Sequence, residues 1–117
     1  MTVREIKGDD YSVDYDPDAM IINFKGDLSL EGAKEYKPIA ELLENATNND
    51  PLEISLNLRE LAFLNSSGIS MISKFVLSLR KKKNIQLVVL GSSEIPWQGK
   101  SLKNLKKLLP GLKLEVE

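Results

Sequence analysis

The sequence contains neither cysteine nor histidine. The absence of cysteine excludes disulfides, thiol nucleophiles and thiolate metal ligands. The absence of histidine excludes the commonest general base and imidazole metal ligands. Carboxylates and lysines remain, but no pair of them stands out by its spacing. We therefore expect a protein that is not an enzyme and that holds neither a metal nor a cofactor.

Long apolar runs are also missing, because no stretch approaches the ~20 residues that a membrane-spanning helix needs. Residues 1–10 are polar and contain no signal-peptide core. Both absences favour a cytoplasmic protein. Apolar residues nevertheless make up 42% of the chain, which is enough for a hydrophobic core. The length of 117 residues predicts a single domain over residues 1–117.

The charges are unevenly distributed along the chain. Residues 1–60 hold 14 acidic and 6 basic residues, a net charge of −8, whereas residues 61–117 hold 3 acidic and 10 basic residues, a net charge of +7. A basic tail for nucleic acid is one interpretation, but nucleic-acid modules usually also present stacking aromatics. The basic half offers only Phe63, Phe75 and Trp97. We favour halves that complement each other within one fold, or lysines on solvated helix faces, and expect no nucleic-acid partner.

In the first half of the chain, the spacing of apolar residues changes once, from that of strands to that of a helix. Residues 11–15 and 19–24 flank a turn rich in Asp and Pro, which predicts an antiparallel hairpin. Ser29 is the expected N-cap of a first helix. Inside that helix, Pro38 predicts a kink or a break near Lys37, because proline removes a backbone hydrogen bond and clashes with the preceding turn.

Later elements alternate between strands and helices. Strands are expected at residues 52–58, 85–90 and 112–116, and helices at residues 69–79 and 101–109, with Ser101 as the last N-cap. The predicted fold is a mixed α/β sheet of order β-β-α-β-α-β-α-β with helices mainly on one face. Strands joined through helices should be parallel, so that only the first hairpin is antiparallel. The last strand is expected at an edge of the sheet, where a second copy of the chain can pair to form a homodimer.

The most informative stretch lies at residues 61–69, between an apolar strand and an apolar helix. It contains Asn65-Ser66-Ser67-Gly68. Asn and Ser are among the best N-caps, because a short side-chain oxygen accepts from free N–H groups of the first turn. The stretch therefore predicts a strand-to-helix turn that favours anions, and a serine there can carry a phosphate at low electrostatic cost.

This pattern resembles the STAS domain, which is shared by bacterial anti-sigma factor antagonists and the cytoplasmic tails of sulfate transporters. The hallmark of that family is an apolar strand, a short link and then Asp-Ser-Ser/Thr-Gly-Leu/Ile at the start of a helix. Here residues 56–69 match, and Gly26-Asp27-Leu28 resembles the family's Gly-Glu-Leu/Asp turn. The element order matches over about residues 11–116. Asn65 stands where the family usually has Asp.

The resemblance implies an anti-sigma factor antagonist, a protein-interaction module without enzymatic activity. Ser66 would be the phosphoacceptor of a partner that is both serine kinase and anti-sigma factor, while Ser67 and Gly68 shape the turn. Phosphorylation would break the complex with that partner. Asn65 keeps the capping role but lacks the carboxylate, which bears on how the serine is presented to a kinase.

Alternatives remain open for each candidate residue. Ser66 is either the phosphoacceptor or a capping hydroxyl, and Ser67 is interpreted as structural. Gly68 either allows close packing of the helix start on the sheet or is simply tolerated in the first turn. Asp27 is a cap or turn residue that the family places at the border of the partner surface. Trp97 either covers the end of the core or anchors an interface. Two other functions stay open, namely a STAS-like scaffold that binds a protein constitutively, and a sensor that binds a small ligand or nucleotide at Ser66–Gly68.

Overall fold

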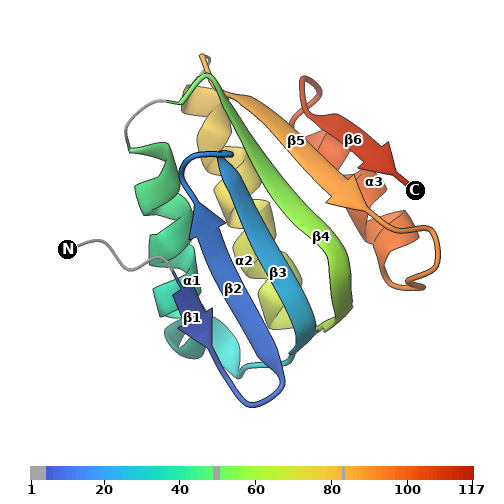
Figure 1. Cartoon of the computed structure of the whole chain (residues 1–117). Coiled ribbons are helices and arrows are strands. Elements are labelled where there is room, and N and C mark those ends of the chain that lie inside the picture. The colour runs from blue at the N-terminus through green and yellow to red at the C-terminus, as the bar shows by residue number, and fades with distance from the viewer. Residues whose placement is uncertain (1–4, 49–50, 83) are drawn as a thin grey trace.

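The computed structural model describes residues 5–48, 51–82 and 84–117 (Figure 1). The strands are β1 (Glu5–Lys7), β2 (Tyr11–Asp16), β3 (Ile21–Leu28), β4 (Glu53–Leu64), β5 (Gln86–Gly91) and β6 (Lys113–Val116). The helices are α1 (Gly32–Thr47), α2 (Ser66–Ser78) and α3 (Gln98–Leu108), and a 3-10 turn, η1 (Leu79–Lys81), follows α2. Within the described residues the strands form one mixed sheet in the order β1-β2-β3-β4-β5-β6. All three helices cover the same face, so the predicted fold class is confirmed (Figure 1).

The predicted hairpin is present, and a further antiparallel strand flanks it. β2 pairs with β3 from Tyr11 opposite Gly26 to Asp16 opposite Ile21. The prediction that only this hairpin is antiparallel is wrong, since β1 also pairs antiparallel with β2. Three residues are too few to show a period of two in a sequence. The pairs β3–β4, β4–β5 and β5–β6 are parallel, with β5 inside the sheet and β6 at its edge, as predicted.

Strand β4 is longer than predicted and leads directly into the motif. Its register against β3 shifts twice, and its buried residues change from every second position to every third after Leu58. Such irregularities bend a strand, which hides the period in the sequence. The strand therefore ends at Leu64 and not near Leu58. Leu52, the first residue of the predicted strand, lies before β4 and is 80% exposed.

Two predicted N-caps are wrong. Helix α1 begins at Gly32 after Glu31, and the free N–H of Glu31 donates to the carboxylate of Glu35, so Ser29 does not cap the helix. Helix α3 begins at Gln98, three residues before Ser101. The side chain of Gln98 is buried, and the chain is fixed there by hydrogen bonds that the local sequence does not reveal.

Helix α1 continues through Pro38 without the predicted break. One face of the helix packs into the core through side chains that are almost fully buried, namely Tyr36, Ile39, Leu42 and Leu43. Burial of four large side chains outweighs the roughly 3 kcal/mol that an interior proline costs. Among the described residues no helix is long and apolar enough to cross a membrane.

Candidate functional site

The turn between β4 and α2 is held by Asn65. Its backbone is extended, and its side-chain Oδ1 accepts from the Gly68 N–H at 3.0 Å, so Asn65 is the N-cap of α2, in line with the sequence. The Ile69 N–H donates to the Asn65 carbonyl at 2.9 Å, the first hydrogen bond of the helix. These two contacts fix where α2 starts and which way its first residues face.

The Asn65 amide also joins α2 to the segment between β3 and α1. Its backbone N–H donates to Leu28 O at 3.1 Å, and its Nδ2 donates to Leu30 O at 2.7 Å. The Gly68 N–H needs an oxygen as its acceptor, so the orientation of the amide is determined and Nδ2 must face Leu30. A carboxylate has no hydrogen to donate to Leu30. The asparagine that departs from the family pattern therefore uses its amide hydrogen here.

Tyr36 of α1 completes this arrangement, and sequence analysis did not identify it as a site residue. Its hydroxyl donates to Asn65 Oδ1 at 2.6 Å and accepts from the Leu30 N–H at 3.3 Å. The side chain is fully buried, and burial raises the pKa of the phenol, against the Leu30 hydrogen bond, which lowers it. In the sequence Tyr36 is only one of several apolar residues on a helix face, so no signal distinguished it.

Gly68 is needed because the start of α2 lies close to its neighbours. A Cβ at this position would lie 2.3 Å from Leu64 Cδ1 and 2.7 Å from the Tyr36 hydroxyl. Both distances are shorter than real carbon contacts, so a side chain would push α2 away from Tyr36 and from the end of β4. The glycine thus allows the close packing of the helix start that the sequence suggested.

Ser66 and Ser67 are the first two residues of α2, and they differ in exposure. Ser66 is exposed and Ser67 is half-buried. Between the described residues no hydrogen bond involves the Ser66 hydroxyl, and the cap is formed by Asn65. The Ser66 hydroxyl therefore faces solvent at the positive end of a helix dipole, where a phosphate is favourable.

A cleft of about 640 Å³ opens beside the two serines, between α1 and α2. Its floor is formed by Tyr36, Met71 and Phe75, and Lys74 and Lys82 also line it. The remaining lining residues are small, hydroxylated or acidic, namely Ala33, Ala40, Glu44, Thr47, Ser66, Ser67, Ser70 and Ser78. The volume lies within the range of small-molecule sites. A cleft with an apolar floor and hydroxyls along its rim also suits a side chain or segment of a partner protein.

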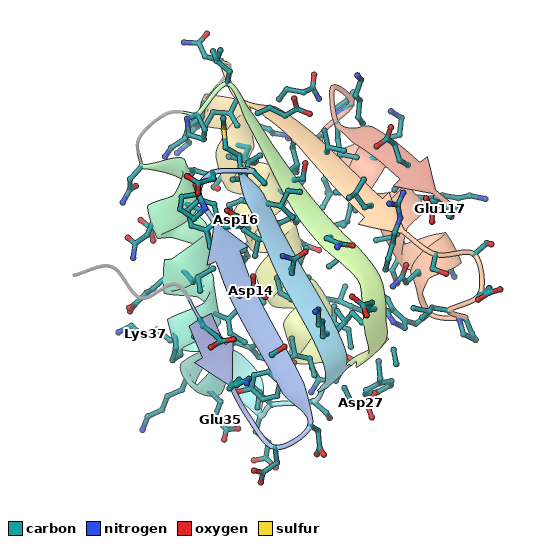
Figure 2. All side chains as sticks on the ribbon, viewed as in Figure 1. Asp14, Asp16, Asp27, Glu35, Lys37 and Glu117 are labelled. Atoms are coloured by element: carbon teal, nitrogen blue, oxygen red, sulfur yellow. The ribbon has the colours of Figure 1, made fainter. Side chains whose placement is uncertain are left out.

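Asp27 and Trp97 lie at the same end of the sheet as the motif. Asp27 is exposed near the end of β3, opposite Phe63 of β4 and next to Leu28, which accepts from the Asn65 N–H (Figure 2). Trp97 is half-buried and its Nε1 donates to Leu61 O at 3.0 Å. All six predicted site residues thus lie near the C-terminal ends of the parallel strands. Asp27 borders β4 from the β3 side, and the Trp97 ring packs on the core near α2 and α3.

The remaining chemistry of the site is sparse. In the described ranges no group of three or more Asp or Glu side chains could hold a metal ion. The phenol of Tyr36, which contacts Asn65, is hydrogen-bonded and buried. The arrangement can present a serine hydroxyl and a neighbouring cleft to another molecule.

Comparisons with known proteins agree with the fold and the motif. The model of the STAS domain family matches residues 11–105. SiaC of Pseudomonas aeruginosa has a similar structure, with a TM-score of 0.76, 14% identity and coverage of 100% of this chain and 98% of SiaC. SiaC in complex with the diguanylate cyclase SiaD, which it activates, gives a TM-score of 0.75 at 14% identity over 97% of this chain and 98% of SiaC. No curated protein sequence matches significantly.

Proposed function

The chain belongs to the STAS domain family, and we propose that it is a protein-interaction module whose partner binding is switched by phosphorylation of Ser66. One observation carries the proposal. Ser66 is exposed on the first residue of α2, and its hydroxyl is not needed for the cap because Asn65 supplies it. The hydroxyl is therefore accessible to a kinase while the helix start stays fixed.

A phosphate on Ser66 changes the surface at the mouth of the cleft. It adds a charge of roughly −1.5 to −2 at neutral pH and three acceptor oxygens. In the free protein the α2 dipole favours this charge. Against a closely packed partner the same dianion must be desolvated or must face like charges, and binding is lost. A local electrostatic change thus controls assembly without a change of fold.

The proposed partner is a protein that contacts the motif and the cleft between α1 and α2. By resemblance to the antagonists it is a serine kinase that is also an anti-sigma factor, and the chain itself catalyses no reaction. Support for a protein partner comes from SiaC, whose fold is similar and which binds the protein SiaD. Lys74 at the cleft and Asp27 at the end of β3 lie beside this surface and can select partners by charge.

The test combines site mapping with partner capture. Intact mass and peptide mapping of the protein from its native cells should show one phosphate, located on Ser66. Ser66→Asp should weaken capture of the partner, whereas Ser66→Ala should not. Ala19→Asp in the exposed turn between β2 and β3, at the opposite end of the sheet, adds the same single charge away from the motif and serves as the control. Equal capture by the Asp and Ala variants would show a constitutive scaffold and end the switch proposal.

The cleft favours a second candidate, a sensor of a small phosphorylated ligand or nucleotide. About 640 Å³ is enough for such a ligand, and Ser66, Ser67 and Lys74 line it. A ligand that binds only the folded state raises the melting temperature in a dose-dependent way. Titration with a panel of nucleotides should therefore raise the melting temperature if this candidate is correct, and a flat response would exclude nucleotides as its ligands.

A further inference from the structure

The uneven charge of the sequence becomes an uneven charge in space. The sheet order follows the chain order, so the acidic half forms β1, β2, β3 and α1 on one flank, and the basic half forms β5, α3 and β6 on the other, with α2 between α1 and α3 (Figure 1). Figure 2 shows Asp14, Asp16 and Glu35 on the flank of β2 and α1. The two halves are therefore placed side by side and do not cover each other. Among the described residues, neither ion pair joins an acidic side chain of residues 1–60 to a basic side chain of residues 61–117, and the lysines of α3 lie exposed on a helix face.

Five cations form a surface that we call the basic stripe. Lys100, Lys103 and Lys107 are exposed at spacings of three and four on α3, so they project from one side of that helix. Arg80 and Lys81 of η1 are also exposed. The Arg80 Nε donates to Leu108 O at 2.6 Å, which holds the guanidinium at the C-terminus of α3. Lysines at 100 and 107 are separated by about 10 Å of helix.

None of these charges is neutralised inside the described parts of the chain. The two ion pairs found there are Lys25–Glu60 and Arg59–Glu117, and neither involves the stripe. Helix α3 contains four lysines and no acidic residue. Like charges three or four residues apart destabilise a helix, and Lys100 lies in the first turn, where the helix dipole disfavours a cation. Lys107 lies in the last turn, where the dipole favours a cation, but no acidic residue of α3 offsets the charges of Lys100 and Lys103.

We propose that the basic stripe binds an acidic segment of a protein partner. A short segment fits because the stripe is short and residues 1–60, on the other flank, carry a net charge of −8. A nucleic acid or a membrane surface is larger than the stripe and would also meet the acidic flank, since the whole domain measures only 34 × 34 × 24 Å. At physiological salt, charges interact over about 8 Å. An acidic segment is attracted by the stripe and repelled by the acidic flank, and this difference orients the partner on the stripe.

The chemistry of the stripe also favours a protein segment. Trp97, the aromatic residue next to α3, is half-buried and its Nε1 is bound to Leu61 O, so it is not presented for stacking on bases. Leu77, one turn before Arg80, is 38% exposed and offers a single apolar contact. One apolar side chain beside several cations suits an acidic peptide with an apolar residue. It is too little for membrane insertion.

The experiment is a fluorescence anisotropy titration of the whole chain with three labelled probes. These are a short glutamate-rich peptide, a DNA duplex of similar length and vesicles of phosphatidylglycerol mixed with phosphatidylcholine. The test variant carries Lys100→Glu, Lys103→Glu and Lys107→Glu together. A control variant carries Lys7→Glu, Lys34→Glu and Lys37→Glu, which are exposed on the acidic flank. Both variants have the same net charge, and circular dichroism verifies that both are folded.

The expected result is peptide binding that weakens with salt. The test variant should lose at least about tenfold in affinity, while the control changes less than about twofold. Tighter binding of the duplex or of the vesicles would overturn the proposal, as would equal losses in both variants or no peptide binding at low salt. None of the three substituted lysines lines the cleft beside Ser66, so a negative result leaves the phosphorylation proposal intact.

Discussion

Replacing Asn65 with aspartate, the usual residue of the STAS motif, tests whether the amide hydrogen of this chain is essential. In the wild type, Oδ1 accepts from the Gly68 N–H and the Tyr36 hydroxyl, and Nδ2 donates to Leu30 O at 2.7 Å. An aspartate keeps the first two contacts. Its second oxygen would face the Leu30 carbonyl oxygen, so that two acceptors oppose each other.

The cost can be worked out from these contacts. A lost hydrogen bond removes about 0.5 to 1.5 kcal/mol, and an unsatisfied buried acceptor adds up to about 1 to 3 kcal/mol. Asn65 is only half-buried, and a negative charge at the N-terminus of α2 gives back about 0.3 to 1 kcal/mol. We expect Asn65→Asp to lower the free energy of unfolding by about 1 to 2 kcal/mol at pH 7. For a chain of this size the melting temperature falls by roughly 4 to 8 °C.

The loss of unfolding free energy in Asn65→Asp should depend on pH. The Leu30 oxygen disfavours the charged form by more than the dipole of α2 favours it, so the pKa of the introduced carboxyl lies above the value in the unfolded chain. The penalty is then complete above the folded-state pKa and disappears as the pH falls below the unfolded-state value of about 4. Urea unfolding of wild type and variant from pH 7 down to about 4 measures the difference at each pH, where other carboxyl groups contribute equally to both proteins.

Asn104→Asp, the same chemical change on the exposed side of α3, is the matched control and should alter stability by less than about 0.5 kcal/mol. The reasoning is refuted if Asn65→Asp is as stable as the wild type at pH 7. It is also refuted if the variant is destabilised by an amount that does not change with pH.

Two further substitutions examine the packing around Asn65. Gly68→Ala should lower the free energy of unfolding by about 1 to 3 kcal/mol, because its Cβ would overlap Leu64 and Tyr36, while Gly99→Ala, with nothing within 4 Å, should raise it by up to about 1 kcal/mol in urea unfolding. Tyr36→Phe should cost about 1 to 2 kcal/mol at pH 8. Because burial raises the pKa of Tyr36, the contribution of its hydroxyl to the free energy of unfolding is complete below pH about 10 and is lost at higher pH. The wild type should therefore lose more stability between pH 8 and 11 than Tyr36→Phe, and an equal loss in both would contradict a buried phenol.

Most of the fold could be predicted because its main strands and helices have clear apolar periods. The hairpin, the parallel strands after it and the three helices follow from alternation and from spacings of three and four. The wrong element boundaries have physical causes outside the local sequence. The buried Gln98 bonds to Leu58 O at 2.6 Å and to the Ser92 N–H at 2.8 Å, which starts α3 three residues before Ser101. Strand β4 extends to Leu64 because irregular pairing with β3 conceals its period.

The site could be located from the sequence, but its construction could not. Asn65 as the cap and Gly68 as a close-packing residue follow from local chemistry. The contact between Tyr36 and Asn65 joins residues 29 positions apart, and the acceptor of Nδ2 is a backbone oxygen of Leu30. Neither partner carries a signal in one sequence. From the sequence, the replacement of Asp by Asn therefore looks like the loss of a charge, whereas in the structure it provides a hydrogen-bond donor.

This difference determines where a switch at Ser66 can act. Asn65 is neutral and is bound on both sides of its amide, so a phosphate on Ser66 meets no neighbouring carboxylate in the motif and the helix dipole favours it. Phosphorylation should then leave the free domain as stable as before or stabilise it slightly. Any loss of partner binding must come from the interface, where the dianion is desolvated. In the Ser66→Asp variant, stability and partner affinity should therefore change independently or in opposite directions. A parallel fall of both would place the effect in the motif's own packing.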